Sequence, residues 1–350
     1  MSFDWSAAYA PRVARFQGSA IREMFHYAQL PGIIALSAGS PAPELFPVQQ
    51  FREACNRVLA EDAGPALQYG ITEGFIPLRE WLVEHLAAKG IKVGLDEVLI
   101  TTGSLQAMDL LIRVLVNAGD LVVVERPTFI GTLQALDAIE AEYLSASIDD
   151  DGLIVDELAG RMASLGRQPR LICAQPNFQN PSGVSLSLDR RLALVQLASQ
   201  HNVPVIEDDP YAELLYEGEP LPPLKALDQR GQVVYLGSFS KILMPGLRVG
   251  WAAGPRQVLE KMSLIKQGSD LHTDGFIQRV INLLVRSGFL PGHIEALRAE
   301  YRIRRDAMID AIQEHFPPGV RFTHPRGGLF VWVELPEGID CTKFVRQAVD

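Results

Sequence analysis

Short apolar runs alternate with longer helical patterns through the middle of the chain. Each run has the length of a buried strand, and helix-period stretches such as residues 104–117 and 188–200 lie between the runs. Strands that are apolar along their whole length and are separated by helices predict a mostly parallel sheet covered on both faces. The expected strands are 98–101, 121–125, 171–174, 203–207, 233–237 and 249–252.

The two flanks of this α/β pattern have a different character. Residues 1–45 are rich in loops and prolines, whereas residues 293–316 form a long helical pattern and residues 327–333 alternate like a strand. We therefore expect an N-terminal arm at 1–45, a large α/β domain at 46–286 and a C-terminal segment at 287–350. The arm and the C-terminal segment are expected to pair into a smaller α+β domain.

Composition narrows the class of protein. The chain has 350 residues with 32 basic and 42 acidic side chains, and this net charge of −10 argues against the broad basic surface of a nucleic-acid binder. Cys55, Cys173 and Cys341 lack metal-ligand spacing and suit reduced thiols. The first residues lack the apolar core of a signal peptide, and no apolar run is long enough to cross a bilayer. We expect a cytoplasmic protein without a nucleic-acid or membrane partner.

Polar and aromatic residues with distinct chemistry follow the predicted strands. Ligands of open α/β sheets bind beyond the carboxyl ends of the strands, so these residues are expected to share one site. Together they offer an anion-binding helix start, a stacking surface, an amide, a carboxylate, a phenol and a lysine. A phosphorylated aromatic aldehyde with a ring nitrogen uses all of these groups. In chain order the residues are Gly103, Ser104, Phe129, Asn180, Asp208, Tyr211, Ser238, Ser240, Lys241 and Arg248.

Each of these residues also has an ordinary structural explanation. Ser104 suits a helix N-cap, Asn180 before a proline suits a turn, and Lys241 after a strand suits a solvated turn. The acidic run at 207–209 could instead bind a divalent cation. The combination is far less expected by chance than any single member, and it therefore favours one cofactor site.

Longer motifs give the chain a family resemblance. It resembles fold type I aminotransferases, which use pyridoxal 5′-phosphate (PLP), and most closely the branch of α-aminoadipate and kynurenine aminotransferases. The resemblance runs through nearly the whole chain and implies an α/β large domain, with a mostly parallel sheet between helices, plus a smaller α+β domain. The matching stretches are SAIREMF at 19–25, SAGSPAPELFP at 37–47, LQYGITEGFIPLRE at 67–80, ITTGSLQAMDL at 100–110, QNPSG at 179–183, EDDPY at 207–211, the highly specific GSFSKILMPGLRVGW at 237–251, KQGSDLHT at 266–273 and RGGLFVWVELP at 326–336.

The resemblance implies a role for each strand-end residue. Lys241 would carry the cofactor as a Schiff base and move the α-proton of the substrate, which requires a depressed pKa. Asp208 would pair with the pyridine nitrogen and keep it protonated. Asn180 and Tyr211 would bind the phenolic oxygen, and Phe129 would stack on the ring. The residues expected around the phosphate are Gly103, Ser104, Leu105, Ser238, Ser240 and Arg248.

Further positions match the family outside the strand ends. Tyr69 matches a tyrosine that reaches the phosphate of the partner subunit, which implies a homodimer with shared active sites; its alternative is packing within its own subunit. Gly39 and Asn180 match residues that line the substrate site. Ser19 and Arg22 match a helix that reads the substrate side chain, although Arg22 would also suit a solvated helix position.

The chain departs from the family pattern at two places. Leu105 stands where this branch usually carries a polar residue next to the phosphate, and backbone donors are expected to compensate. The chain also ends at Asp350, before the segment in which the family supplies an arginine for the substrate α-carboxylate. From the sequence we therefore expect a truncated C-terminal segment and doubtful turnover.

The expected function is transamination by a ping-pong mechanism. An L-amino acid, whether aminoadipate, aromatic or aliphatic, would donate its amino group to a 2-oxo acid such as 2-oxoglutarate. A PLP-dependent lyase or decarboxylase of the same fold is an alternative. Others are the PLP-binding effector domain of a transcription regulator, for which the α/β pattern begins too early to leave room for a winged helix, and a non-catalytic scaffold. The histidines show no metal-ligand spacing, and no metal is expected.

Overall fold

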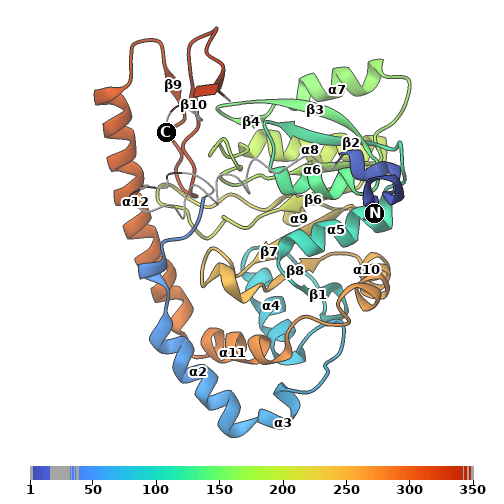
Figure 1. Ribbon diagram of the computed structural model, residues 1–350, viewed down its shortest axis with the longest axis vertical. Helices are drawn as coiled ribbons and strands as arrows, with labels where there is room; N and C mark the ends of the chain where they lie inside the picture. The colour runs from blue at the N-terminus through green and yellow to red at the C-terminus, as the bar shows by residue number, and fades with distance from the viewer. Residues whose placement is uncertain are drawn as a thin grey trace.

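The computed structural model describes residues 3–15, 32, 34, 36, 39–341, 343, 344 and 347. Helices and strands alternate through most of this part of the chain (Figure 1). The α-helices are α2 (Val48–Glu61), α3 (Ala63–Ala66), α4 (Ile76–Ala88), α5 (Ser104–Leu115), α6 (Ile130–Asp137), α7 (Val155–Ser164), α8 (Leu188–His201), α9 (Leu224–Leu227), α10 (Arg256–Ser269), α11 (Gly275–Arg286) and α12 (Phe289–His315). The 3₁₀ helices are η1 (Trp5–Ala8), η2 (Pro11–Arg15), η3 (Pro43–Leu45), η4 (Leu95–Glu97) and η5 (Pro245–Leu247). No described helix has the length and apolarity of a membrane span.

One large sheet organises the molecule. Its strands are β1 (Val98–Thr101), β2 (Leu121–Arg126), β3 (Glu142–Asp149), β4 (Gly152–Leu153), β5 (Leu171–Ala174), β6 (Val205–Asp208), β7 (Val233–Ser238) and β8 (Gly250–Ala253), in the order β1-β8-β7-β6-β5-β2-β3-β4. The neighbours from β7 to β3 are parallel, and β8 runs antiparallel to both β7 and β1. A mostly parallel sheet was predicted, and the structure confirms it.

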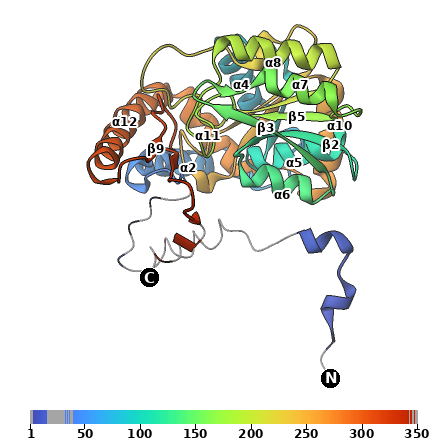
Figure 2. The same ribbon diagram turned by 90° about the horizontal axis from the view of Figure 1, so that it is seen from above.

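Helices cover both faces of the sheet, as the uniformly apolar strands predict (Figure 2). Successive residues of one strand enter different cores because side chains alternate across a sheet. In β2, for example, Val122 and Val124 pack with α5, α6 and α10, whereas Leu121 and Val123 pack with α7 and α8. This double burial explains why the strands read as continuous apolar runs rather than as alternating ones.

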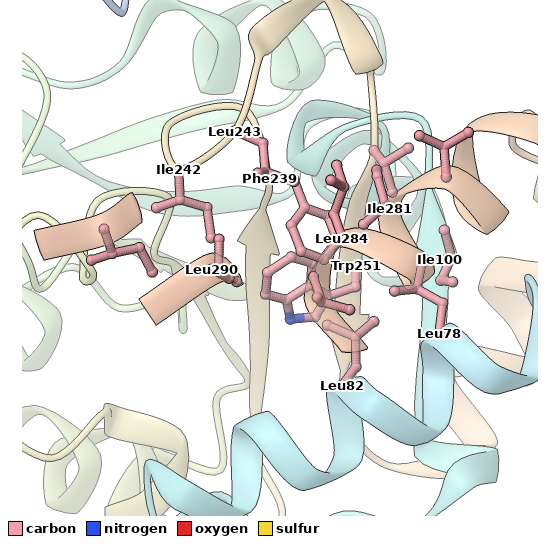
Figure 3. Packing of buried hydrophobic residues seen from close by; sticks show 14 of the residues in the cluster. Leu78, Leu82, Ile100, Phe239, Ile242, Leu243, Trp251, Ile281, Leu284 and Leu290 are labelled. Atoms are coloured by element: carbon pink, nitrogen blue, oxygen red, sulfur yellow. The ribbon is translucent and has the colours of Figure 1, made fainter. Parts of the chain in front are cut away.

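A third core joins the β1 end of the sheet to the helices at both ends of the chain. Leu78 and Leu82 of α4 belong to this cluster with Trp251 of β8, and Phe239, which follows β7, lies in it too (Figure 3). The rings of Phe239 and Trp251 are 4.9 Å apart. Because Phe239 lies two residues before Lys241, this core holds the backbone that carries the candidate lysine.

Two expectations need correction. The strand predicted at 327–333 is wrong, because only the short strand β10 (Val333–Glu334) forms there, paired with β9 (Arg321–Phe322). Gly328 has a φ of 77°, and a Cβ there would lie 2.4 Å from the Cβ of Phe178. The chain therefore turns at Gly328 in close contact with the Phe178 side chain. The pattern also gave no strand at β3 or β4, since half of β3 is solvent-facing and polar.

Candidate active site

The carboxyl ends of β1, β5, β6 and β7 meet at one edge of the sheet, where the predicted site residues gather. The antiparallel strand β8 begins at the same edge, and its Gly250 pairs with Thr101 of β1 and with Ser238 of β7. Arg248, which precedes β8, is thereby brought back to the start of α5. The antiparallel strand therefore explains how an arginine seven residues after Lys241 reaches the other strand ends.

Lys241 lies at this edge with its amine largely shielded from solvent. Its Nζ donates a hydrogen bond to the carbonyl oxygen of Gly39 at 3.1 Å and lies 5.7 Å from the centre of the Tyr211 ring. Burial, together with the positive charge of Arg248, lowers the pKa of Lys241 to about 8. A larger fraction of this amine is therefore neutral near pH 7 than for a solvated lysine, which suits a nucleophile or a base.

Asp208 closes β6 and is 3% exposed. Its Oδ2 accepts a hydrogen bond from Gln175 Nε2 at 2.5 Å, whereas its Oδ1 is buried and has no partner among the described residues. Burial raises the pKa of Asp208 to about 7, and the Gln175 hydrogen bond opposes that rise. An unpaired buried carboxylate oxygen is costly, so Oδ1 fits a donor that a bound group brings, such as a protonated ring nitrogen.

Glu207 and Asp209, the acidic neighbours of Asp208, each accept hydrogen bonds from other groups. Glu207 accepts hydrogen bonds from the backbone N–H groups of Leu224 and Lys225 at the start of α9. Asp209 accepts hydrogen bonds from Asn177 and Tyr235. Within the part of the chain that the structure describes, no three His, Cys, Asp or Glu side chains form a group able to hold a metal ion. The carboxylates of Glu207 and Asp209 are therefore bound to groups other than those that contact Asp208.

Tyr211, whose ring lies close to the Lys241 amine, forms a pair with Asn180. The side chain of Asn180 is a hydrogen-bond partner of the buried Tyr211 hydroxyl, and burial, reinforced by the charge of Asp208, raises the pKa of Tyr211. The Asn180 backbone N–H donates to Gln175 Oε1 at 3.0 Å. The tyrosine therefore stays neutral and able to donate a hydrogen bond at physiological pH.

The start of α5 forms an anion-binding corner. Gly103 is the N-cap, with a φ of 82°, and Ser104 is the first helical residue, so the N-cap expectation for Ser104 is wrong by one position. A Cβ at Gly103 would lie 2.4 Å from Arg248 Nη2, and a Cβ at Gly250 would lie 2.5 Å from the Ser104 nitrogen. Both glycines are needed for this close packing, which brings a guanidinium against the free N–H groups of a helix start.

Two buried hydroxyls border the same corner. Ser238 Oγ donates to Ser240 Oγ at 2.9 Å and accepts a hydrogen bond from the Ser240 backbone N–H.

Phe129 and Leu105 meet beside Gly131, where an added Cβ would lie 2.4 Å from the Phe129 ring and 3.0 Å from Leu105 Cδ1. The apolar Leu105 therefore packs next to the aromatic ring that was predicted to stack on a cofactor.

Gly39 supplies the remaining wall close to Lys241. Its φ is 57°, and a Cβ there would lie 2.2 Å from the ring of Phe330, which in turn meets the Tyr211 ring edge-on at 5.8 Å. A side chain at position 39 would displace the Phe330 ring, and the positive φ also favours glycine at this position. The predicted substrate residues Ser19 and Arg22 lie outside the described residues.

Tyr69 is separate from these groups. It is 78% exposed and contacts His272 edge-on, with 5.9 Å between the ring centres. The next residue, Thr273, lies 3.2 Å from Thr102 between the two hydroxyl oxygens, beside the anion-binding corner. In the single chain the Tyr69 side chain therefore lies mostly at the surface, with its ring against that of His272.

Sequence reasoning missed the polar residues beneath the site. Gln175 follows β5 directly and contacts both Asp208 and Asn180, yet only the later residues 177–183 were considered after this strand. Glu125, the last acidic residue of β2, accepts a hydrogen bond from Gln179 at 3.2 Å, and burial raises its pKa to about 8. Ligands bind beyond the carboxyl ends of the strands, so the last residues of each strand and the first residue after it are also candidates. Including them would have identified both Glu125 and Gln175.

A cavity of about 840 Å³ adjoins the site without containing it. Its lining includes Asn177, Asp209 and Glu213 but not Lys241 or Asp208. The strand-end groups, rather than this cavity, therefore define the candidate active site.

Comparison with known proteins agrees with this geometry. Residues 31–350 match the family described as aminotransferase class I and II. Aromatic-amino-acid aminotransferase 1 of Thermococcus litoralis is 42% identical over 99% of this chain and 84% of its own length. The kynurenine aminotransferase of Pyrococcus horikoshii, solved with pyridoxamine phosphate (PMP) and kynurenine, has a TM-score of 0.94 at 42% identity, covering 99% of this chain and 86% of that one.

A third relative is known with a cofactor–amino acid adduct. The α-aminoadipate aminotransferase LysN of Thermus thermophilus, complexed with N-(5′-phosphopyridoxyl)-L-leucine, has a TM-score of 0.92 at 38% identity, covering 99% of this chain and 87% of that one. The predicted fold type I architecture and the resemblance to this branch are confirmed. The chain belongs to the class I and II aminotransferase family.

Proposed function

We propose that this aminotransferase moves the amino group of an L-amino acid to a 2-oxo acid such as 2-oxoglutarate, with Lys241 and Asp208 as its principal catalytic groups. When bound, PLP supplies an aldehyde for the incoming amine and a ring that takes up electrons from the substrate α-carbon. The observation that carries the proposal is the buried Oδ1 of Asp208, which has no hydrogen-bond partner among the described residues. It lies at the same edge of the sheet as the shielded Lys241 amine. These two groups suit opposite ends of one cofactor.

The side chains divide the work by their chemistry. Lys241 Nζ attaches the cofactor and carries the α-proton, which its lowered pKa favours. Asp208 Oδ1 holds the proton of the ring nitrogen, and the hydroxyl of Tyr211 with the amide of Asn180 holds the phenolic oxygen. Phe129 stacks on the ring. The phosphate is assigned to Gly103, Ser104, Leu105, Ser238, Ser240 and Arg248.

In this proposal the substrate is bound beside Lys241, along the wall to which Gly39 belongs. Asn180 holds one oxygen of its α-carboxylate, and Ser19 and Arg22 read its side chain. The relatives named above act on aromatic amino acids, kynurenine and aminoadipate, which directs the choice of donors.

A donor panel tests the reaction. Purified protein loaded with PLP is incubated with 2-oxoglutarate and with aminoadipate, kynurenine, an aromatic or an aliphatic amino acid, and glutamate is measured. We expect glutamate with at least one donor and parallel double-reciprocal plots, the mark of a ping-pong mechanism. Release of ammonia or CO₂ without glutamate would instead indicate a lyase or a decarboxylase, and cofactor binding without any product would indicate an effector domain or scaffold.

We further propose a homodimer in which Tyr69 reaches the phosphate of the partner subunit. Tyr69 is accompanied by Leu67 and Ile71 on its own segment and by Leu271 on the neighbouring one, each at least 45% exposed in the single chain. Exposed apolar side chains clustered on two adjoining segments are typical of a subunit interface. The proximity of Thr273 to Thr102 places this surface beside the anion-binding corner.

Mixing two defective variants tests the shared site. Lys241→Ala and Tyr69→Ala each damage every site of their own homodimer, but a mixed dimer has one site with both native residues if Tyr69 acts across the interface. We expect the refolded mixture to recover activity above the sum of the two separate variants. The control is a mixture of Lys241→Ala with Asp208→Asn. Because each proposed site takes both of these residues from the same subunit, the mixed dimer has no intact site, and we expect no recovery. No recovery in the Tyr69 mixture would place Tyr69 in its own subunit's site.

The domain division and the location of the protein are also proposals. We retain residues 1–45 as an arm, 46–286 as the large domain and 287–350 as a C-terminal segment that joins the arm. A cytoplasmic location is supported by the free thiols of Cys55, Cys173 and Cys341.

A further inference from the structure

Gln175 links the two residues proposed to hold opposite sides of the cofactor ring. Its Nε2 donates to Asp208 Oδ2 at 2.5 Å, and its Oε1 accepts the backbone N–H of Asn180 at 3.0 Å. The side chain is 7% exposed, so neither contact is weakened by competition with bulk water. Gln175 has no part in the family motifs identified in the sequence.

The orientation of this amide follows from its partners. A backbone N–H can only donate, so the atom facing Asn180 must be the carbonyl oxygen Oε1. The amide nitrogen must then face Asp208. A donor on Oδ2 leaves Oδ1 as the atom that is free to meet the cofactor.

We propose that Gln175 is a positioning residue that orients Asp208 and keeps its carboxylate ionised, so that Oδ1 holds the proton of the cofactor's ring nitrogen. The inference rests on the proposed function, in which the cofactor is bound at this edge. A neutral donor stabilises the charged form of a buried carboxylate without adding a second charge. Gln175 thereby offsets the burial that would otherwise favour a protonated Asp208, which could not retain the ring proton.

The backbone of Gln175 is held in place by a second layer of polar groups. Its N–H donates to both carboxylate oxygens of Glu125 at 3.3 Å, and Gln179 donates to the same carboxylate and, at 2.8 Å, to the carbonyl oxygen of Pro127. These bonds tie the residue after β5 to the end of β2. The backbone that carries the Gln175 side chain is therefore fixed by hydrogen bonds.

Replacing Gln175 by methionine keeps the length of the side chain and removes both polar contacts. Ring-nitrogen protonation is followed by ¹⁵N NMR with ¹⁵N-labelled PLP as a function of pH, and PLP affinity is measured on the apoprotein. We expect the ring nitrogen of Gln175→Met to lose its proton at lower pH than in the wild type. PLP affinity should fall about 10- to 100-fold, the range for one hydrogen bond to a charged group.

Gln175→Glu separates the two contacts of the side chain. Its carboxyl keeps an acceptor for the Asn180 N–H, and it donates to Asp208 only while protonated. We therefore expect near-wild-type ring protonation at acid pH and a loss that resembles Gln175→Met as pH rises. Rescue that follows pH is not expected of a residue with a purely structural role.

Gln232→Met is the matched control. This half-buried glutamine donates to the carbonyl oxygens of Ala198 and Val203, away from the site, and its replacement should leave ring protonation unchanged. Unchanged ring protonation and affinity in Gln175→Met, or wild-type behaviour of Gln175→Glu at every pH, would overturn the inference. A wild-type chain that binds no PLP would instead remove the proposed function and this inference with it.

Discussion

Lys241→Ala is expected to abolish both the visible absorbance of the lysine-bound cofactor and the transfer of the amino group. The substitution removes the only atom in the proposed site that attaches the cofactor and carries the α-proton. A positioned proton-transfer group contributes up to about 10,000-fold to a rate, and loss of the attachment adds to this. Absorbance spectra and glutamate formation, measured after loading with PLP, give the two readouts independently.

Lys225→Ala is a matched control for this result. Lys225 is also a partly buried lysine whose pKa is lowered by burial, but it lies at the start of α9, 3.9 Å from Asp228. Its loss should leave absorbance and turnover intact. Persistence of both signals in Lys241→Ala would show that another amine holds the cofactor.

The lowered pKa of Lys241 also predicts how cofactor attachment depends on pH. The amine attacks only when neutral, and burial with the charge of Arg248 moves its midpoint down from 10.5 to about 8. Attachment of PLP to the apoprotein should therefore accelerate as pH rises and level off above about 8. A midpoint near 10 would contradict a shielded Lys241.

Asp208→Asn is expected to lower turnover about 100- to 10,000-fold, because removal of one partner from a buried charged pair costs about 3–5 kcal/mol. The amide keeps the size of the side chain but has no charge to retain the proton on the ring nitrogen. Glutamate formation under saturating donor and ¹⁵N NMR of the labelled cofactor measure the two consequences. A turnover within a few-fold of the wild type would remove Asp208 from the proposed mechanism.

Asp209→Asn provides the control for burial and charge at the next position. Asp209 is also buried, but it is bound by Asn177 and Tyr235 rather than facing the site. This variant should lose stability by about 0.5–3 kcal/mol, as is usual for a perturbed buried hydrogen-bond network, while retaining ring protonation. The two variants therefore separate damage to the fold from damage to the site.

Local sequence signals were sufficient for the strands and for most of the site. Strands such as β1, β5 and β7 are buried on both faces, and this burial leaves a continuous, mostly apolar run in the sequence. Since parallel strands end at one edge, the residues after them, including Asp208 and Lys241, could be grouped without coordinates. The half-exposed β3 has no such signature and was missed.

Other features depend on contacts between distant segments and could not be inferred from local patterns. The antiparallel course of β8, which brings Arg248 to Gly103, arises from strand pairing. The turn at 327–333 follows from the position of the Phe178 ring rather than from its own alternating pattern. The role of Gln175 appears only when β5, β6 and Asn180 are placed together. Residue types and spacing thus identified the chemical groups, whereas packing determined which of their atoms are paired and which remain available to a cofactor.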